Sequence, residues 1–146
     1  MKLLVKKLND KATMPQRQTE YSAGYDLCAC LDEPVTVKAG ETKKIPIGIS
    51  LELEGTKEAV LLIHARSSLA CKLGLAPANC VGVVDWDYRG EIVVVLHNHS
   101  KNDYTINHGD RIAQLVITPI FTPEVEEATE LSDTERGAGG FGSTGK

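Results

Sequence analysis

The sequence has no apolar run that approaches the roughly 20 residues of a membrane-spanning helix. Its first residues, Met1–Lys7, lack the longer apolar stretch and the small-residue cleavage site of a signal peptide. Basic residues are too few to suggest a long nucleic acid as partner, since 16 Lys and Arg stand against 20 Asp and Glu. These absences predict a cytoplasmic protein (or a nuclear or viral-host cytosolic one, if the source is not bacterial) without a membrane span.

The four cysteines form no C-x-x-C pair, so their spacing is a poor match to a zinc site. Free buried thiols are expected in a cytoplasmic chain. His97 and His99 would share one face of a strand, but no carboxylate or cysteine nearby in the sequence completes a metal site, which favours surface or interface histidines. The cysteines are Cys28, Cys30, Cys71 and Cys80.

The hydrophobic pattern has the period of β-strands. Between Lys44 and Leu53 apolar residues occupy every second position, which is period 2 and not 3.6. Ala59–Ile63, Glu91–Leu96 and Ile112–Ile120 are short apolar runs typical of buried strands, and turn residues separate them. Short strands at intervals of about ten residues predict a single all-β sandwich or barrel.

One segment, Ser67–Gly74, favours a short helix instead. Ser67 is a candidate N-cap, and Gly74 is placed to end the helix in a left-handed conformation. The free N–H groups of such a helix would lie beside Arg66 and could bind an anion.

The last eleven residues, Arg136–Lys146, contain five glycines. Composition alone indicates a flexible tail. However, consecutive glycine N–H groups can wrap a polyphosphate, Arg136 supplies charge, and the ring of Phe141 could stack on a base. The segment does not have the order of residues of a Walker P-loop.

Five segments stand out together, and in this order and at these separations they closely resemble the five motifs of the homotrimeric dUTP pyrophosphatase (dUTPase) family. The resemblance covers nearly the whole chain. The segments are Ala23–Leu27, Ala65–Ala70, Gly82–Gly90, Gly109–Leu115 and Arg136–Gly145.

The resemblance implies a jelly-roll-like β-barrel or sandwich with one short helix and a flexible glycine-rich tail. It implies a β domain over residues 1–135 and an arm over residues 136–146 that closes over an active site, expected to belong to a neighbouring subunit of a homotrimer. The implied reaction is Mg²⁺-assisted hydrolysis of dUTP to dUMP and pyrophosphate, with water attacking the α-phosphorus. It would limit uracil incorporation into DNA and supply dUMP for dTMP synthesis.

Asp85 lies between the apolar run Val81–Val84 and the polar turn Asp87–Gly90. A carboxylate at the edge of an apolar hairpin is suited to act as a general base. Considered alone, Asp85 is better explained as a turn residue. By resemblance, it activates the attacking water.

The same hairpin is implied to bind the nucleoside. Asn79 and the main chain from Val83 through Val84 to Asp85 would read uracil, with a weaker backbone contact from Val93 on the return strand. Fixed backbone donors and acceptors would reject cytosine, whose amino group leaves them unpaired. Tyr88 resembles the residue that packs under the deoxyribose and excludes a 2′-hydroxyl.

The phosphates are implied to bind elsewhere in the chain. Arg66 and Ser68 would supply donors, Ser67 would contact the bridge between the α- and β-phosphates, and Gln114 would contact the α-phosphate. From the tail, Arg136 would bind the γ-phosphate, Phe141 would stack on uracil, and Gly142 would contact the substrate. Asp26 would reach Mg²⁺ through water, while the substrate phosphates supply its direct ligands.

Some residues depart from the family pattern, and others suggest a structural role. Trp86 follows the proposed base where a small or polar residue is usual, and it could pack at a subunit contact or line the mouth of the site. His64 stands where an apolar residue or proline is more common. Asp110 and Arg111 suggest an ion pair near a subunit interface.

Three other functions are conceivable for this sequence. A dCTP deaminase shares the fold superfamily but does not explain the glycine-rich tail or the hairpin from Asn79 to Tyr88. A non-catalytic regulatory module would not need Asp85, Arg66 and Gln114 together, although a second role stays open. A structural β-sandwich with a disordered tail would leave the five motifs unexplained.

Overall fold

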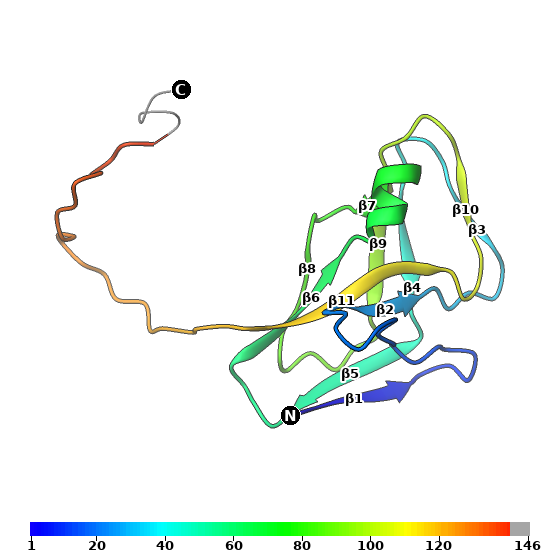
Figure 1. Cartoon of the computed structure of the whole chain (residues 1–146), viewed down its shortest axis with the longest axis horizontal. Helices are drawn as coiled ribbons and strands as arrows, with labels where there is room; N and C mark the ends of the chain where they lie inside the picture. Colours follow the sequence, from blue (N-terminus) through cyan, green and yellow to red (C-terminus); the bar gives the residue numbers. More distant parts are fainter. Residues whose placement is uncertain (141–146) are drawn as a thin grey trace.

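Eleven β-strands and one short helix follow one another in the computed structural model, which describes residues 1–140 (Figure 1). No helix among these residues is long and apolar enough to cross a membrane. Because strands make up nearly all of the regular structure of these residues, the all-β prediction is confirmed. The elements are β1 (Lys2–Lys7), β2 (Tyr25–Cys28), β3 (Val35–Val37), β4 (Thr42–Pro46), β5 (Ile49–Glu54), β6 (Ala59–His64), η1 (Leu69–Leu73), β7 (Leu75–Pro77), β8 (Gly82–Val84), β9 (Val93–Asn98), β10 (Tyr104–Ile106) and β11 (Arg111–Pro119).

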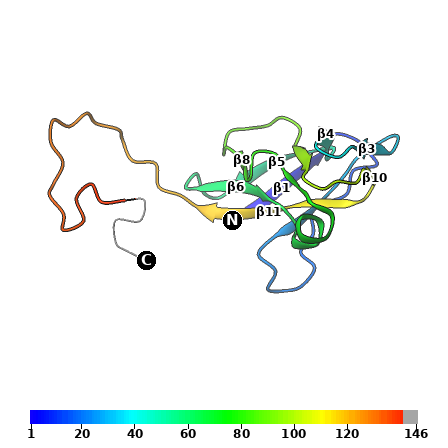
Figure 2. The same ribbon diagram turned by 90° about the horizontal axis from the view of Figure 1, so that it is seen from above.

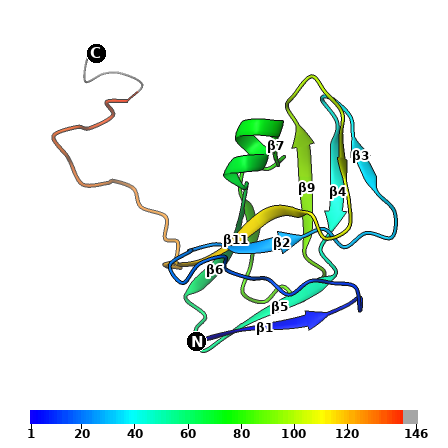
Figure 3. The same cartoon turned by 45° about the vertical axis from the view of Figure 1, so that its right-hand side comes forward.

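The strands form antiparallel ladders that enclose one core. The largest ladder has the order β2-β11-β6-β8, and a second has the order β4-β9-β7. Two further pairs, β1-β5 and β10-β3, lie at opposite ends of the body (Figures 1 and 3). This arrangement joins strands far apart in the sequence, so the core depends on non-local pairing.

The alternation between Lys44 and Leu53 correctly predicts which apolar side chains are buried. All five apolar side chains from Ile45 to Leu53 are at most 3% exposed. The pattern nevertheless spans two strands, because Gly48 adopts φ 73° and the chain leaves the ladder of β4 for that of β5. Period 2 thus identified the core face but not the change of ladder.

The expected hairpin between Val84 and Val93 is not a paired hairpin, and this prediction was wrong. Strand β8 pairs with β6, whereas β9 pairs with β4 and β7. The turn after Asp85 therefore carries the chain from one ladder to another. A sequence pattern gives the two strands and the turn but not which neighbour each strand takes.

The helix η1 ends as predicted but begins differently. Gly74 adopts φ 68°, and its N–H donates to the carbonyl oxygens of Ala70 and Leu69, which closes the C-terminus. Ser68, not Ser67, occupies the N-cap position, and its side chain makes no capping hydrogen bond. The N-cap prediction for Ser67 was therefore wrong, which leaves the Ser67 hydroxyl available for another partner.

The four thiols are free, but only two are buried. Burial raises the pKa of Cys28 and of Cys30 above the ordinary thiol value. Cys71 and Cys80 are exposed, so the expectation of burial was wrong for them.

The two histidines of β9 and its following turn lie against each other. The ring of His97 lies 4.4 Å from that of His99, and its Nδ1 is hydrogen-bonded to the Thr42 hydroxyl at 2.8 Å. Among residues 1–140, no three His, Cys, Asp or Glu side chains gather as a metal site. The surface or interface assignment is consistent with this geometry.

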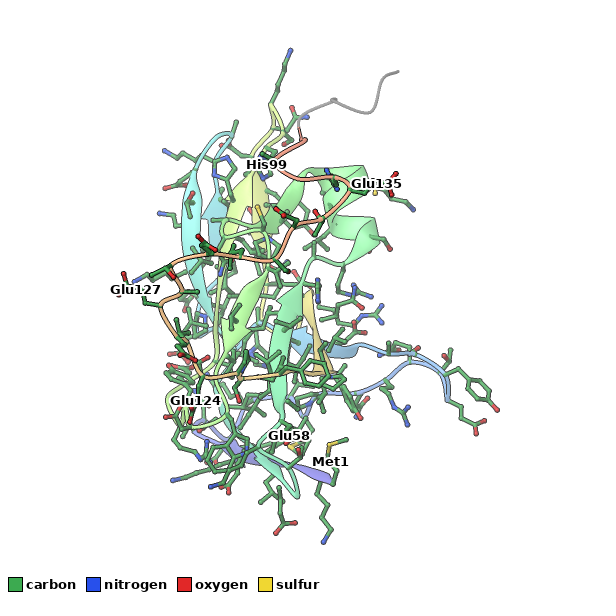
Figure 4. All side chains as sticks on the ribbon, turned by 90° about the vertical axis from the view of Figure 1, so that its left-hand side faces the viewer. Met1, Glu58, His99, Glu124, Glu127 and Glu135 are labelled. Carbon is green, nitrogen blue, oxygen red and sulfur yellow. The ribbon has the colours of Figure 1, made fainter. Side chains whose placement is uncertain are left out.

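The segment after β11 runs away from the body as a single extended chain (Figures 1 and 2). Its apolar side chains Phe121, Val125 and Leu131 are at least 89% exposed. Glu124, Glu127 and Glu135 mark its course in Figure 4. The body therefore ends near Pro119, and the boundary placed at residue 135 stays a prediction.

Gly48→Ala is expected to lower the free energy of unfolding by about 2–4 kcal/mol, because it combines left-handed strain with overpacking. A Cβ at Gly48 would lie 2.7 Å from Cys30 Sγ and 3.0 Å from Ala12 Cβ. Gly40→Ala is the matched control, since Gly40 has the same φ of 73° but nothing within 4 Å. Urea denaturation should show a clearly smaller loss for Gly40→Ala, and equal losses would contradict the packing argument.

Candidate active site

A cavity of about 740 Å³ opens over the ladder of β2, β11 and β6; we call it the Arg66 pocket. Five residues predicted to bind phosphate or Mg²⁺ line it together, although they come from three separate motifs. These are Asp26, Arg66, Ser67, Ser68 and Gln114, and His64 and Cys80 line the same cavity.

Three of the lining side chains form one row across the sheet. Gln114 on β11 pairs in register with Asp26 on β2 on one side and with His64 on β6 on the other. Directly opposed residues on antiparallel strands point to the same face. The period of 2 in each strand therefore places these three side chains side by side on the outer face.

The Gln114 amide is held in one orientation. Its Nε2 donates to the carbonyl oxygen of Ala65 at 2.9 Å. A Cβ at Gly24 would clash with Gln114 Oε1, so glycine is required where the segment before β2 crosses the amide. The pocket wall is thus preformed around Gln114.

Asp26 joins the two arginines of the site. Its Oδ1 accepts from Arg66 Nε at 2.8 Å, and its Oδ2 accepts from Arg111 Nη1 at 3.2 Å. Arg66 Nη1 also donates to the main-chain oxygen of Arg111 at 3.3 Å, which closes a ring of contacts. The carboxylate is 10% exposed, so screening by water is weak and the pairs fix the Arg66 guanidinium at the pocket.

The expected ion pair between Asp110 and Arg111 was wrong. Asp110 Oδ2 instead accepts from the main-chain N–H of Asn107 at 2.8 Å and closes the turn before β11. The register of β11 with β2 shifts between Arg111 and Ala113, a bulge that turns the Arg111 side chain toward Asp26.

A second cavity of about 210 Å³, the Asp85 pocket, lies between β8 and the start of β9. It brings together all the predicted nucleoside-binding residues of this region except Asn79. Tyr88 is fixed at its edge, because the phenol donates to the carbonyl oxygen of Glu91 at 3.0 Å and the ring lies against Gly90. Its lining includes Val83, Val84, Asp85, Tyr88, Ile92 and Val93.

The two pockets share no lining residue. Strand β6 separates them, since Ile63 lines the Asp85 pocket and the next residue, His64, lines the Arg66 pocket. Successive side chains of a strand point to opposite faces. One chain therefore presents the proposed base and the proposed phosphate contacts on two different surfaces.

The dUTPase family model matches residues 10–145 of the chain. This chain belongs to the dUTPase family. It is 51% identical over 146 residues to the deoxyuridine 5′-triphosphate nucleotidohydrolase of Nautilia profundicola, with all of both chains covered. It is 48% identical over 142 residues to the enzyme of that name from Rickettsia felis, covering 97% of this chain and 95% of the relative.

Solved dUTPases have the same fold, which confirms the jelly-roll-like prediction. The Staphylococcus bacteriophage 80alpha dUTPase with dUPNHPP superposes with a TM-score of 0.89 at 31% identity, covering 99% of each chain. A mutant dUTPase from phage phi11 of S. aureus, described with a structural Mg(II) ion, gives a TM-score of 0.81 at 27% identity. It covers 91% of this chain and 100% of that one.

Several predicted dUTPase residues lie outside both pockets. The Asn79 amide nitrogen lies near Gly82 at the start of β8, 3.6 Å from where a Cβ would stand. Arg136 lies in the extended segment, where its Nε donates to the Gly139 carbonyl oxygen at 2.8 Å. Phe141 and Gly142 lie outside the described residues, so their assignments stay predictions.

Trp86 lines neither pocket. Its Nε1 donates to the carbonyl oxygen of Leu53 at the end of β5, at 3.1 Å. Lys57 and Arg89 lie 5.0 and 5.5 Å from its ring, within the range of cation–π contacts. In this chain the indole therefore ties the Asp85 turn to β5.

The sequence did not predict the positions of two side chains at or beside the Arg66 pocket. Arg111 was assigned a structural pair with the wrong partner, and His64 was noted only as a departure from the family pattern. Strand register could have indicated His64, because an unbroken ladder between β6 and β11 places it opposite Gln114.

The Asp26–Arg66 pair is expected to couple strongly in a double-mutant cycle of Asp26→Asn and Arg66→Gln, by about 1–3 kcal/mol in unfolding free energy. Asp26→Asn leaves the largely buried Arg66 without its carboxylate, Arg66→Gln leaves Asp26 with Arg111 as its one remaining ion-pair partner among the described residues, and the double change removes the pair. The exposed Lys11–Asp32 pair, also 2.8 Å apart, is the matched control and should show no measurable coupling. Additive effects at Asp26 and Arg66 would contradict the argument.

Proposed function

We propose that this protein is a dUTP diphosphatase that hydrolyses dUTP to dUMP and pyrophosphate. The observation that carries the proposal is the grouping of the motif residues into two pockets, one with a base at its edge and one lined by phosphate donors. The 51% identity to a deoxyuridine 5′-triphosphate nucleotidohydrolase over the whole chain supports the same substrate. The reaction limits the uracil available for incorporation into DNA.

The Asp85 pocket is proposed to bind deoxyuridine. Strand β8 is the last strand of its ladder, and among the described residues no strand pairs with its outer edge. The N–H and C=O groups of every second residue of β8 can therefore face a base and fix the order of donors and acceptors. This geometry selects uracil over cytosine, because a mismatched partner would leave buried polar groups unpaired.

Tyr88 is proposed to exclude ribose. Its ring cannot move freely, because the phenol is bound to the Glu91 carbonyl oxygen and the ring lies against Gly90. A fixed ring under the sugar leaves no room for a 2′-hydroxyl, so UTP would be turned over far more slowly than dUTP.

Asp85 is proposed to take a proton from the attacking water. The carboxylate is exposed at the pocket edge, where it can reach water beside the α-phosphate. As the water oxygen bonds to the α-phosphorus, the bond to the bridging oxygen breaks and pyrophosphate leaves. Arg66, Ser67 and Ser68 are placed to stabilise the charge on the phosphates, with Arg66 held by Asp26.

The Asp26 site fits Mg²⁺ only at a distance. Both carboxylate oxygens already accept from guanidinium groups, and residues 1–140 hold no cluster of three possible ligands. Mg²⁺ is therefore proposed to take phosphate oxygens and waters as direct ligands, with Asp26 reached through water. When bound, the ion neutralises phosphate charge.

The active unit is proposed to be a homotrimer in which each site combines surfaces of different chains. The separation of the Asp85 pocket from the Arg66 pocket by β6 supports this, since the two pockets of one chain share no lining residue. The body, which ends near Pro119, would supply both surfaces, and the arm over residues 136–146, with Arg136 and Phe141, would close a neighbouring site.

Asp85→Asn is expected to reduce the rate of pyrophosphate release from dUTP by about 10²–10⁴-fold, because the amide cannot accept the proton. Binding of a non-hydrolysable imido analogue of dUTP, measured by calorimetry, should change little. Asp87→Asn, two residues along the same turn, is the matched control and should remain active. Undiminished turnover by Asp85→Asn would show that another group is the base.

Co-expression of two inactive variants, Asp85→Asn and Arg66→Gln, is expected to restore activity. If each site takes Asp85 from one chain and Arg66 from another, random assembly leaves about a quarter of the sites with both groups intact. A mixture of Arg66→Gln and Ser67→Ala, which alter the same pocket, should stay at the level of the separate variants.

The same mixing tests the arm. A chain that ends at Glu135 keeps Asp85 but lacks the arm, whereas an Asp85→Asn chain keeps the arm. Mixing the two should restore activity if the arm of each chain closes a site that takes Asp85 from another chain. Light scattering must give a mass of about three 15.8 kDa chains for these tests to apply. Full activity of a monomer would overturn the shared-site proposal.

A further inference from the structure

We propose that His64 is an additional phosphate-binding residue, and that its protonated imidazole strengthens binding of the substrate's polyphosphate. The proposal rests on the function proposed above, because it takes the Arg66 pocket as the phosphate site. His64 stands where an apolar residue or proline is more common in the family, and the proposal gives it a role.

The first argument is position. His64 ends β6 on the outer face, is partly exposed, and lines the Arg66 pocket. It stands directly opposite Gln114, and the Cβ atoms of such pairs are about 4.5–5.5 Å apart. A phosphate oxygen that reaches the Gln114 side chain therefore lies within reach of the imidazole.

The second argument is charge. Arg66 shares its charge with Asp26, and the same carboxylate holds Arg111. Among the described residues no carboxylate forms an ion pair with His64, so a protonated imidazole would add positive charge to the pocket. A triphosphate carries several negative charges and is stabilised by each such donor.

The third argument concerns the other donors in the row. Gln114 already uses one amide hydrogen on the Ala65 carbonyl oxygen. Its amide can offer a phosphate only one further N–H, and that bond is neutral. The imidazolium offers a charged N–H, and charge-assisted bonds are roughly twice as strong as neutral ones.

The titratable and charged groups that face His64 across the pocket are Asp26, Arg66 and Cys80. Histidine is the side chain whose charge ordinarily changes between about pH 5 and pH 8. Phosphate binding should therefore weaken as the pH rises through this range, and the change should depend on His64.

The test uses inorganic tripolyphosphate, which probes the pocket without the nucleoside. Calorimetry measures its affinity at about pH 6 and about pH 8. Between these two values the wild type should lose about ten times more affinity than His64→Gln. His64→Lys, which keeps its charge across the range, should bind at pH 8 as tightly as at pH 6. His97→Gln, on β9 outside the pocket, is the control and should retain the wild-type pH dependence.

Equal pH dependence in wild type and His64→Gln, or no gain at pH 8 from His64→Lys, would overturn the proposal. Thermal midpoints of the variants establish that they are folded, and His64→Lys supplies the test if His64→Gln is not. A parallel dUTP assay separates the two proposals. If dUTP is hydrolysed but wild type and His64→Gln show the same pH dependence, only the His64 role is wrong. If the pH dependence differs but dUTP is not hydrolysed, only the proposed function is wrong.

Discussion

The geometry of the Arg66 pocket depends on one carboxylate that two guanidinium groups share. Asp26 on β2 holds Arg66, which follows β6, and Arg111, which begins β11, so three strands of one ladder meet at it. Burying such charges costs desolvation free energy, and their attraction recovers it only with good geometry. The main contribution of Asp26 is therefore to position the Arg66 guanidinium at the pocket before any ligand binds.

The same ladder explains why the site is divided. The two faces of β6 carry different chemistry, with Ile63 on the side of the Asp85 pocket and His64 on the side of the Arg66 pocket. A strand presents successive side chains to opposite faces, so no local rearrangement brings the two pockets together within a chain. This separation of the two pockets is the physical basis of the proposal that a second copy of the chain completes each site.

Sequence patterns predicted the core of this dUTPase better than its strand pairing. Period 2 identified the five buried apolar side chains from Ile45 to Leu53, because the alternation of a strand is a local property, but it did not indicate that Ser50 between them is also buried. It could not show that Gly48 takes the chain to another ladder, or that β8 pairs with β6 rather than β9. The motifs likewise identified Asp26 and Arg66, but the contact of Arg111 with Asp26 depends on a bulge and on register.

The net charge of −4 is unevenly distributed, and its distribution bears on how the arm works. Residues 1–119 contain 14 basic and 14 acidic side chains, whereas residues 120–135 contain six acidic and no basic ones. Like charges repel and keep a linker extended, and 16 residues can span about 50 Å. A body of this size is only about 35 Å across. The acidic segment is therefore long and extended enough to carry Arg136 beyond its own body, which is what the proposed closure of a neighbouring site needs.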